Sequence, residues 1–250
     1  MMQISDNCNS KENHIIQALS SSEYEYLAPH LEMVEMFKGE ILFEADSTKS
    51  QYVYFPTTAV VSLLCYMEDG ATVEVATIGK EGMLGISAFL GGEGLIGAMI
   101  LTSGNLYRVS INLLQNVLVR TGGRRVGNLH KVLLQYTYSM FIQISQLTAC
   151  NRRHNLEQQL SRWLLLNFDR HSTNHMSLTH ESIGIILGVP SEGITEAARK
   201  LKQFDAIDYS HGLIELKDRS SLERMSCECY EIIKMQSFAY NQTDFPGLSR

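Results

Sequence analysis

The stretch 178–216, LTHESIGIILGVPSEGITEAARKLKQFDAIDYSHGLIEL, carries the signals for two short helices followed by a β-hairpin. Thr179 is a typical N-cap residue, and Gly188 can adopt the positive φ that ends a first helix. Pro190 cannot continue that helix but suits the start of a second one. Apolar residues then recur at helical spacing at Ile194, Ala197, Ala198 and Leu201. The turn Ser210-His211-Gly212 lies between two strand-like runs, so the whole stretch predicts a winged helix-turn-helix, whose usual partner is double-stranded DNA.

The outward face of the second predicted helix holds the candidate DNA contacts. We expect base contacts from Ser191, Glu192 and Glu196, with the Glu192 carboxylate accepting a hydrogen bond from a cytosine amino group. Phosphate contacts are predicted for Thr179, Thr195, Arg199 and Lys200. Cations are few on this face and in the hairpin turn. A second hypothesis therefore remains open, in which the domain has degenerate DNA recognition and acts mainly through protein–protein contacts.

Composition and charge point to a two-domain protein that works inside the cell. A chain of 250 residues can bury a core in each of two domains. We expect it to be cytoplasmic, because it has no apolar run of membrane-spanning length, no signal-peptide pattern in residues 1–13 and only scattered cysteines. Residues 1–125 hold 8 of the 21 Lys and Arg and 14 of the 27 Asp and Glu, which places the net charge of −6 in this half. The balanced C-terminal half can still present a basic face locally.

The N-terminal half, residues 1–125, has the pattern of a β-roll behind a short helical lead-in. Glycines separate short runs rich in β-branched and aromatic residues, at 41–43, 53–55, 60–65, 73–75 and 106–109. Asp69-Gly70, between two of these runs, is a good hairpin signal. Many short strands with regular turns predict a double-stranded β-helix of the jelly-roll type.

A long helix is predicted at residues 126–153, which contain no Pro and no Gly after Gly127. Two overlapping apolar stripes run along it, so one face can pack on the β-roll while the other meets a second copy of the chain. The residues expected in this dimer interface are Val126, Leu129, Leu133, Tyr136, Thr137, Met140, Ile144 and Leu147. An ordinary core helix is the alternative.

Residues 154–236 complete the predicted architecture as the winged helix-turn-helix domain. A shorter helix from Asn155 to Arg170 leads into it, with Trp163 as a core anchor of that domain, and residues 237–250 are expected to form a flexible tail. The predicted fold class is therefore α+β, with an N-terminal β-roll, a long dimerisation helix and a C-terminal DNA-binding domain.

This order of parts resembles the Crp/Fnr family of bacterial transcription regulators over nearly the whole chain. The resemblance is carried by VVSLLCYMEDGATVEVATIGKEGMLG at 60–85, ACNRRHNLEQQLSRWLLL at 149–166 and ILGVPSEGITEAARKL at 186–201, and SCECY at 226–230 is similar to the end of one subgroup. It implies a homodimer that recognises a near-palindromic DNA site with one recognition helix per half-site. It also implies a β-roll of the cyclic-nucleotide-binding type, and RNA polymerase as a further partner.

The chain departs from this family where many members bind a cyclic nucleotide. Those members have Gly-Glu followed by Arg-Ser or Arg-Thr, and the Arg binds the phosphate, whereas GGEGLIGAMILTSG at 91–104 has Gly92-Glu93 and no Arg. We therefore expect no cyclic-nucleotide binding of the usual kind, and the effector is unknown. Gly92, Glu93, Arg124 and Arg125 form a candidate effector or switch site, with solvated arginines at a domain junction as the alternative for the last two.

No metal site, cofactor or catalytic residue is predicted. An iron–sulfur cluster needs four cysteines close in space, and Cys8 alone lies near the N-terminus. Cys227 and Cys229 are expected on one helix, opened by a capping box at Ser220 and Glu223, where residues two apart point to nearly opposite sides. Both thiols are therefore interpreted as packing residues, and the eight histidines are dispersed along the chain, so no metal site is predicted from them. Motifs of hydrolases and phosphate loops are absent, so the chain is not expected to be an enzyme.

Overall fold

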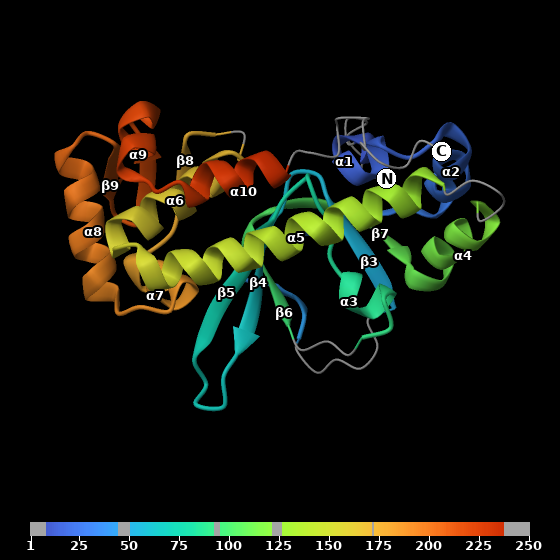
Figure 1. The fold of residues 1–250 in the computed structure, drawn as a ribbon, viewed down its shortest axis with the longest axis horizontal. Helices are drawn as coiled ribbons and strands as arrows, with labels where there is room; N and C mark the ends of the chain where they lie inside the picture. The colour runs from blue at the N-terminus through green and yellow to red at the C-terminus, as the bar shows by residue number, and fades with distance from the viewer. Residues whose placement is uncertain (1–8, 45–50, 93–95, 122–126, 172, 238–250) are drawn as a thin grey trace, which may run out of the picture.

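The structure, a computed structural model, describes residues 9–44, 51–92, 96–121, 127–171 and 173–237 (Figure 1). Strands dominate its N-terminal part and helices its C-terminal part, so the predicted α+β architecture is confirmed. The helix α5 (Asn128–Arg153) runs across the front of the molecule and joins the two parts (Figure 1). No described helix is both long enough and apolar enough to cross a membrane.

The N-terminal part is a roll of two antiparallel sheets. One sheet has the order β1 (Glu32–Met36), β7 (Gly104–Ser110), β3 (Tyr52–Pro56). The other has the order β2 (Ile41–Phe43), β6 (Gly97–Thr102), β4 (Val60–Tyr66), β5 (Thr72–Ile78). The five predicted strand runs fall in β2, β3, β4, β5 and β7, and Gly70, with φ of 84°, makes the predicted turn between β4 and β5. β1 and β6 were missed because β1 is mostly exposed and β6 begins with Gly97 and Ala98, which are not typical strand residues.

Short helices close the roll, at α1 (His14–Gln17), α2 (Ser21–Leu27), α3 (Ile86–Phe89) and α4 (Ile111–Thr121). Asn13 holds α1 in place against the roll. Its fully buried side chain accepts hydrogen bonds from the backbone of α1 and donates to the carbonyls of Pro56 at 2.9 Å and Gly82 at 2.8 Å. All the polar atoms of this side chain are thereby satisfied inside the core, which fixes α1 over the sheets.

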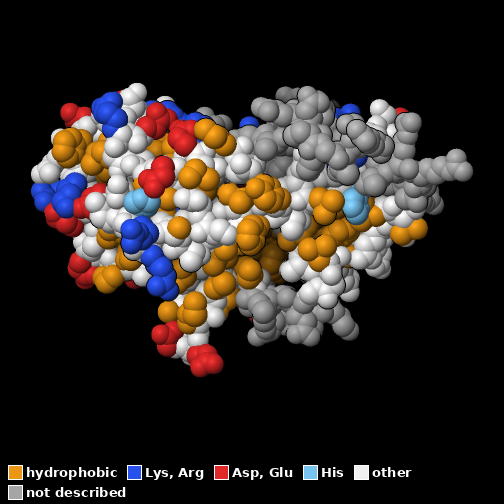
Figure 2. All heavy atoms as spheres, viewed as in Figure 1, with side chains coloured by type: hydrophobic (Ala, Val, Ile, Leu, Met, Phe, Trp, Pro, Cys, Tyr) orange, Lys and Arg blue, Asp and Glu red, His pale blue; other side chains and the backbone are white. Residues whose placement is uncertain are grey.

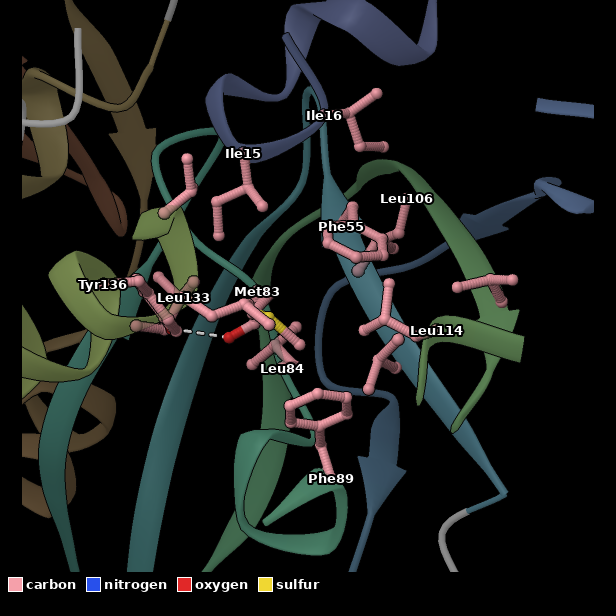
Figure 3. Packing of buried hydrophobic residues seen from close by; sticks show 14 of the residues in the cluster. Ile15, Ile16, Phe55, Met83, Leu84, Phe89, Leu106, Leu114, Leu133 and Tyr136 are labelled. Atoms are coloured by element: carbon pink, nitrogen blue, oxygen red, sulfur yellow. Dashed lines mark hydrogen bonds between the residues drawn. The ribbon is translucent and has the colours of Figure 1, made fainter. Parts of the chain in front are cut away.

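The interior of the roll is filled by its own side chains (Figure 3). Phe55, Leu106 and Leu114 pack there with Met83, and Tyr136 of α5 closes the space from the other side. The Tyr136 hydroxyl donates a hydrogen bond of 2.5 Å to the Met83 carbonyl. Because a buried tyrosine needs a partner for its hydroxyl, this bond fixes α5 to the roll as well as covering apolar surface.

The C-terminal part is a helical domain with a small sheet. After α6 (Leu156–Phe168), β8 (His175–Ser177) pairs with the hairpin of β9 (Ile207–Ser210) and β10 (Leu213–Leu216). The helices α7 (His180–Leu187) and α8 (Ser191–Gln203) lie between β8 and β9 in sequence, and α9 (Arg219–Met225) and α10 (Cys229–Ser237) end the described chain. The predicted tail, residues 237–250, falls outside the described residues after Ser237.

The dimer interface predicted for α5 is wrong for half of its residues, because they are buried in the roll. Leu129, Leu133, Tyr136 and Met140 are buried in the core of the chain's own roll, so they are not available to a partner. The opposite side, which we call the exposed α5 face, consists of Leu134, Thr137, Tyr138, Phe141 and Ile144. Of the other predicted interface residues, Leu147 is half-buried and Val126 lies outside the described residues.

Two buried polar contacts join the C-terminal domain to the roll. The Trp163 indole donates to Glu74 Oε1 at 2.9 Å, and Arg170 Nε lies 2.6 Å from Glu81 Oε1. Burial raises the pKa of the Glu74 carboxyl, although the hydroxyls of Ser62 and Thr77 also donate to it. Trp163 is thus buried as predicted, but at the joint between the two domains and not only in the core of its own.

The chain around α9 and α10 differs from the predicted single helix. Asp218, not Ser220, caps α9, and its carboxylate accepts from the Ser220 backbone at 2.9 Å. The helix ends at Met225, and α10 begins at Cys229. Cys227 therefore lies in the connection, where the helical period does not apply, and its thiol is free to point to the same side as that of Cys229.

Candidate nucleic-acid interface

The turn between α7 and α8 is built by the residues that the sequence singles out. The Thr179 hydroxyl accepts from the Ser182 backbone at 3.1 Å and caps α7, and Gly188 ends the helix with φ of 68°. Gly184, which the sequence analysis does not use, matters as well. A Cβ at this position would lie 2.8 Å from the Val189 carbonyl oxygen, so the chain can turn tightly only because residue 184 is glycine.

The helix α8 buries the predicted apolar face and leaves its polar face outside. Ile194, Ala197, Ala198 and Leu201 are all buried, which confirms the predicted period. Of the predicted DNA-contacting residues on α8, Glu192, Thr195, Glu196 and Arg199 are exposed, and Ser191 and Lys200 are half-buried. Figure 1 shows α8 at the end of the molecule farthest from α4.

Each cation of α8 is paired with a carboxylate in the free protein. Arg199 donates two hydrogen bonds to Glu196, from Nη2 at 2.6 Å and from Nε at 3.1 Å, which lowers the pKa of the Glu196 carboxyl. Lys200 pairs with Glu157 of α6, and Lys202 Nζ lies 2.5 Å from Asp208 Oδ1 of β9. A DNA phosphate would therefore have to compete with these acids for each cation.

A contact that is not evident from the sequence holds α7, α8 and the hairpin of β9 and β10, which we call the wing, together. The Thr195 hydroxyl donates to the Ser191 carbonyl at 3.0 Å and so accepts from His180 Nδ1 at 2.9 Å. The His180 ring also stacks on Tyr209 of β9, with 3.9 Å between the ring centroids. Partial burial lowers the pKa of His180, which favours the neutral ring in this position. An aromatic residue in the wing and a histidine at the start of α7 are the only sequence signals of this contact.

The wing is a tight hairpin fixed to the start of α7. His211 and Gly212 have φ of 50° and 77°, the values of a two-residue turn with both φ positive. The Leu178 backbone donates to the Gly212 carbonyl at 2.7 Å, which places the turn beside the N-cap Thr179. Ser210 and His211 are exposed there, so the wing tip offers hydroxyl and imidazole groups instead of a guanidinium.

The predicted effector site can be placed only in part. Gly92 is exposed near the end of α3, and its backbone donates to the Ser87 carbonyl at 2.8 Å. Glu93, Arg124 and Arg125 lie outside the described residues. The structure therefore does not bring this set together, and it stays a prediction.

The exposed α5 face is an apolar surface of unusual extent for a single helix. Leu134, Tyr138 and Phe141 are 55%, 58% and 66% exposed. Figure 2 shows hydrophobic side chains gathered over the middle of α5 on this side of the molecule. Together with Thr137 and Ile144 they form a continuous stripe at heptad-like spacing, the pattern of a helix that packs along a second helix.

Comparison with known proteins identifies the type of domain and fold. Residues 158–225 match the family model of the Crp-like helix-turn-helix domain. A Crp/Fnr-family protein from Eubacterium rectale superposes with a TM-score of 0.65 at 16% identity, covering 86% of this chain and 98% of the other. FixK2 from Bradyrhizobium japonicum gives 0.64 at 17% identity, with 79% and 98% covered.

A transcriptional regulator of the CRP/FNR family from Thermus thermophilus gives a TM-score of 0.63 at 17% identity, with 78% and 97% covered. At these identities the structures show a shared fold. Curated protein sequences contain no match to this chain. The proteins from Eubacterium rectale and Thermus thermophilus are both described as transcriptional regulators, the first provisionally.

Proposed function

We propose that the chain is a transcription regulator of the Crp/Fnr type that binds DNA as a homodimer, which its Crp-like helix-turn-helix domain and its fold support. The observation that carries the proposal is the outer face of α8. This face is polar, exposed and held in place by buried residues behind it, as a recognition helix in a major groove has to be.

Within this function, the residues of α8 divide between base and phosphate contacts. Ser191 and Glu192 lie at the N-terminus of α8, the part of a recognition helix that contacts base edges, and Glu192 accepts from a cytosine amino group. Arg199, Lys200, Thr195 and Thr179 contact phosphates. Glu196 reaches a base only if it leaves Arg199, which makes it the weaker of the two acidic candidates.

The homodimer is proposed from the exposed α5 face. Two copies related by a twofold axis would cover the same stripe on each other, and the apolar side chains of Leu134, Phe141 and Ile144 would leave water. A twofold dimer places its recognition helices about 34–36 Å apart, one turn of DNA, which is why the proposed site is near-palindromic. RNA polymerase is a further proposed partner at promoters.

We propose no cyclic-nucleotide binding of the usual kind. The stretch 91–104 offers no Arg to a cyclic phosphate, and among the described residues buried hydrophobic side chains of the roll pack against those of α5. Cyclic AMP and cyclic GMP at millimolar concentration are expected to leave the melting temperature and the DNA affinity unchanged. Saturable, stoichiometric heat of binding in calorimetry would contradict this.

The experiment that tests the function is selection of the full-length protein on randomised double-stranded DNA, followed by titration of the enriched site at two salt concentrations. We expect a site with two inverted half-sites and a Kd at least about a thousand-fold lower than for random DNA. Enrichment without symmetry would contradict the homodimer. Absence of enrichment would contradict sequence-specific binding.

A second candidate function rests on the paired charges of α8. Since Arg199, Lys200 and Lys202 all pair with acids of the same chain, the domain has less free positive charge than phosphate binding usually requires. If selection enriches no sequence, the domain acts through protein–protein contacts, and co-purification with the transcription machinery is the next measurement.

A further inference from the structure

Four metal-ligating side chains meet where α5 passes into α6. Cys150 lies in the last turn of α5, His154 is the C-cap of the same helix, Cys227 lies between α9 and α10, and Cys229 begins α10. Their ligand atoms all lie within 4.8 Å of one another. The residues come from segments about 75 positions apart, so the fold and not the local sequence brings them together.

The spacing of the ligand atoms matches a single tetrahedral ion. Zinc bonds of about 2.3 Å to sulfur and 2.0–2.1 Å to nitrogen put tetrahedral ligand atoms roughly 3.5–3.8 Å apart. Cys150 Sγ lies 3.6 Å from Cys227 Sγ, and Cys229 Sγ lies 3.5 Å from His154 Nδ1. A polynuclear cluster would need room for its own atoms between the ligands and would hold them farther apart.

We propose that Cys150, His154, Cys227 and Cys229 bind one Zn²⁺ ion in a closed structural site. A set of three sulfur ligands and one nitrogen ligand in tetrahedral arrangement is typical of structural zinc. The three cysteines are buried, which leaves no open coordination position for water. Each thiol gives up its proton to solvent as its thiolate binds the ion.

Neighbouring groups already orient two of the ligands. His154 Nε2 lies 3.3 Å from Glu228 Oε2, and a proton on Nε2 beside this carboxylate would leave Nδ1 with its lone pair toward the thiols. Zinc-bound histidines are commonly oriented by a carboxylate in this way. The Gln146 side chain donates to Cys229 Sγ at 3.2 Å, which suits a sulfur that carries negative charge.

A buried cation beside the cluster is a second, independent observation. Arg162 of α6 is fully buried, and none of its guanidinium nitrogens has a hydrogen-bond partner among the described residues. The helix α6 that carries it packs against α10, which begins at the ligand Cys229. One Zn²⁺ with three thiolates carries a net charge of −1, which would add to the counter-charge that a buried guanidinium requires.

The position of the site gives the ion a mechanical role. α5 ends at Arg153 and α6 begins at Leu156, so the two residues between them, with His154 as a ligand, form the joint between the proposed dimer helix and the DNA-binding domain. The ion would connect this joint to α10, which packs along α5. A bound ion would thus fix the angle at which each domain of a dimer presents α8, a consequence that rests on the proposed function.

The test uses the reduced full-length protein, stripped with a chelator and titrated with Co²⁺ and then Zn²⁺ in the absence of DNA. We expect one Co²⁺ per chain with the intense visible bands of a tetrahedral thiolate site, and their loss when Zn²⁺ displaces the ion. Zinc should raise the melting temperature by roughly 5 °C or more. Weak bands of octahedral cobalt, or no saturable binding, would overturn the site.

Matched variants assign the ligands. Cys229→Ser should abolish the cobalt bands, whereas Cys65→Ser, a cysteine on β4 outside the cluster, should leave them unchanged. His154→Cys should retain binding with shifted bands, which controls for misfolding because it keeps four ligands. Full metal binding by a Cys150→Ser, Cys227→Ser double variant would overturn the assignment. So would a Cys150–Cys227 disulfide in protein purified without oxygen.

Titration of DNA with the zinc-loaded and stripped forms tests the mechanical role separately. We expect the stripped form to bind the selected site at least ten-fold more weakly and to bind again when zinc is restored. Equal affinities would overturn the role of the ion in the joint. If neither form selects a DNA site, the proposed function fails, and the metal result still stands on its own spectra.

Discussion

The helices α5 and α8 are built alike on the inside and differently on the outside. Each has an apolar face that is buried in a core of the chain, by Leu129, Leu133 and Met140 on α5 and by Ile194 and Leu201 on α8. The exposed α5 face is apolar as well, whereas that of α8 carries acids and bases paired with one another. The buried faces therefore stabilise the fold, and the exposed faces determine which partners the chain can bind.

This difference separates two kinds of partner. An exposed apolar stripe gains free energy only when another apolar surface covers it, which favours a second copy of α5. A polar face with paired charges gains little from such a surface, but its carboxylates and hydroxyls suit the edges of bases. Substitutions that place the same charged residue on the buried and on the exposed face of α5 test this difference.

The largest effect is expected from a charge on the buried face of α5. Leu133→Asp places a carboxylate at a position only 5% exposed, within the core of the roll. We expect a loss of about 3–5 kcal/mol in the free energy of unfolding, measured by urea denaturation. The neighbouring Leu134→Asp, at 55% exposure, is the matched control and should leave the fold of the protomer intact. Equal destabilisation by both would show that the two faces are not distinct.

Substitution on the exposed α5 face should change assembly without changing the fold. Phe141→Asp puts a charge into the proposed interface from each copy and removes an exposed aromatic ring, so dimerisation should weaken by about 2 kcal/mol or more. Sedimentation at micromolar concentration should show monomers with an unchanged circular dichroism spectrum. Val119→Asp, an exposed apolar residue on α4, is the control. An unaltered dimer in Phe141→Asp would place the interface elsewhere.

The parts predicted from the sequence are those in which short-range signals decide the structure. Gly188, Pro190 and the period of Ile194 to Leu201 define α7, the turn and α8 because a cap, a φ value and a helical repeat are local properties. The hairpin at Gly70 follows from the same kind of signal. Only the assembled fold shows which of two overlapping stripes on α5 covers the roll, because both are apolar.

The thiol cluster was missed for a related reason. Cys150 and the C-cap His154 are four positions apart at the end of α5, a spacing that puts both on one face, but two ligands are too few to indicate a metal site. The packing of α10 on α5, which brings Cys227 and Cys229 to them, is a long-range contact with no local signal. The pairing of Arg199 with Glu196, three positions apart, was within reach of the sequence.

A smaller effect is expected for the base-contacting acid of α8. Glu192 is exposed, and its side chain is negatively charged and cannot bind a phosphate. Its contribution to DNA binding therefore has to be discrimination between bases. Glu192→Ala should cost the preferred site about 1–3 kcal/mol and relax selection at one or two base pairs of each half-site. The dependence of affinity on salt should stay the same. Selection of the same sequences with the same tolerance would make Glu192 an ordinary surface residue.

The smallest and most informative effect concerns the ion pair on the exposed face of α8. If Arg199 contacts a phosphate, it has to give up hydrogen bonds to Glu196 to do so. Arg199→Ala should then weaken binding to all sequences alike and lower the salt slope by up to about one unit. Glu196→Ala should act in the opposite direction, since it releases the guanidinium, and should strengthen binding by less than about 1 kcal/mol. The double variant should match Arg199→Ala alone, because without the arginine the glutamate has no competing partner to release. If instead Glu196→Ala weakens binding and changes the selected sequence, Glu196 contacts a base, and the polar face of α8 recognises DNA through both of its acids.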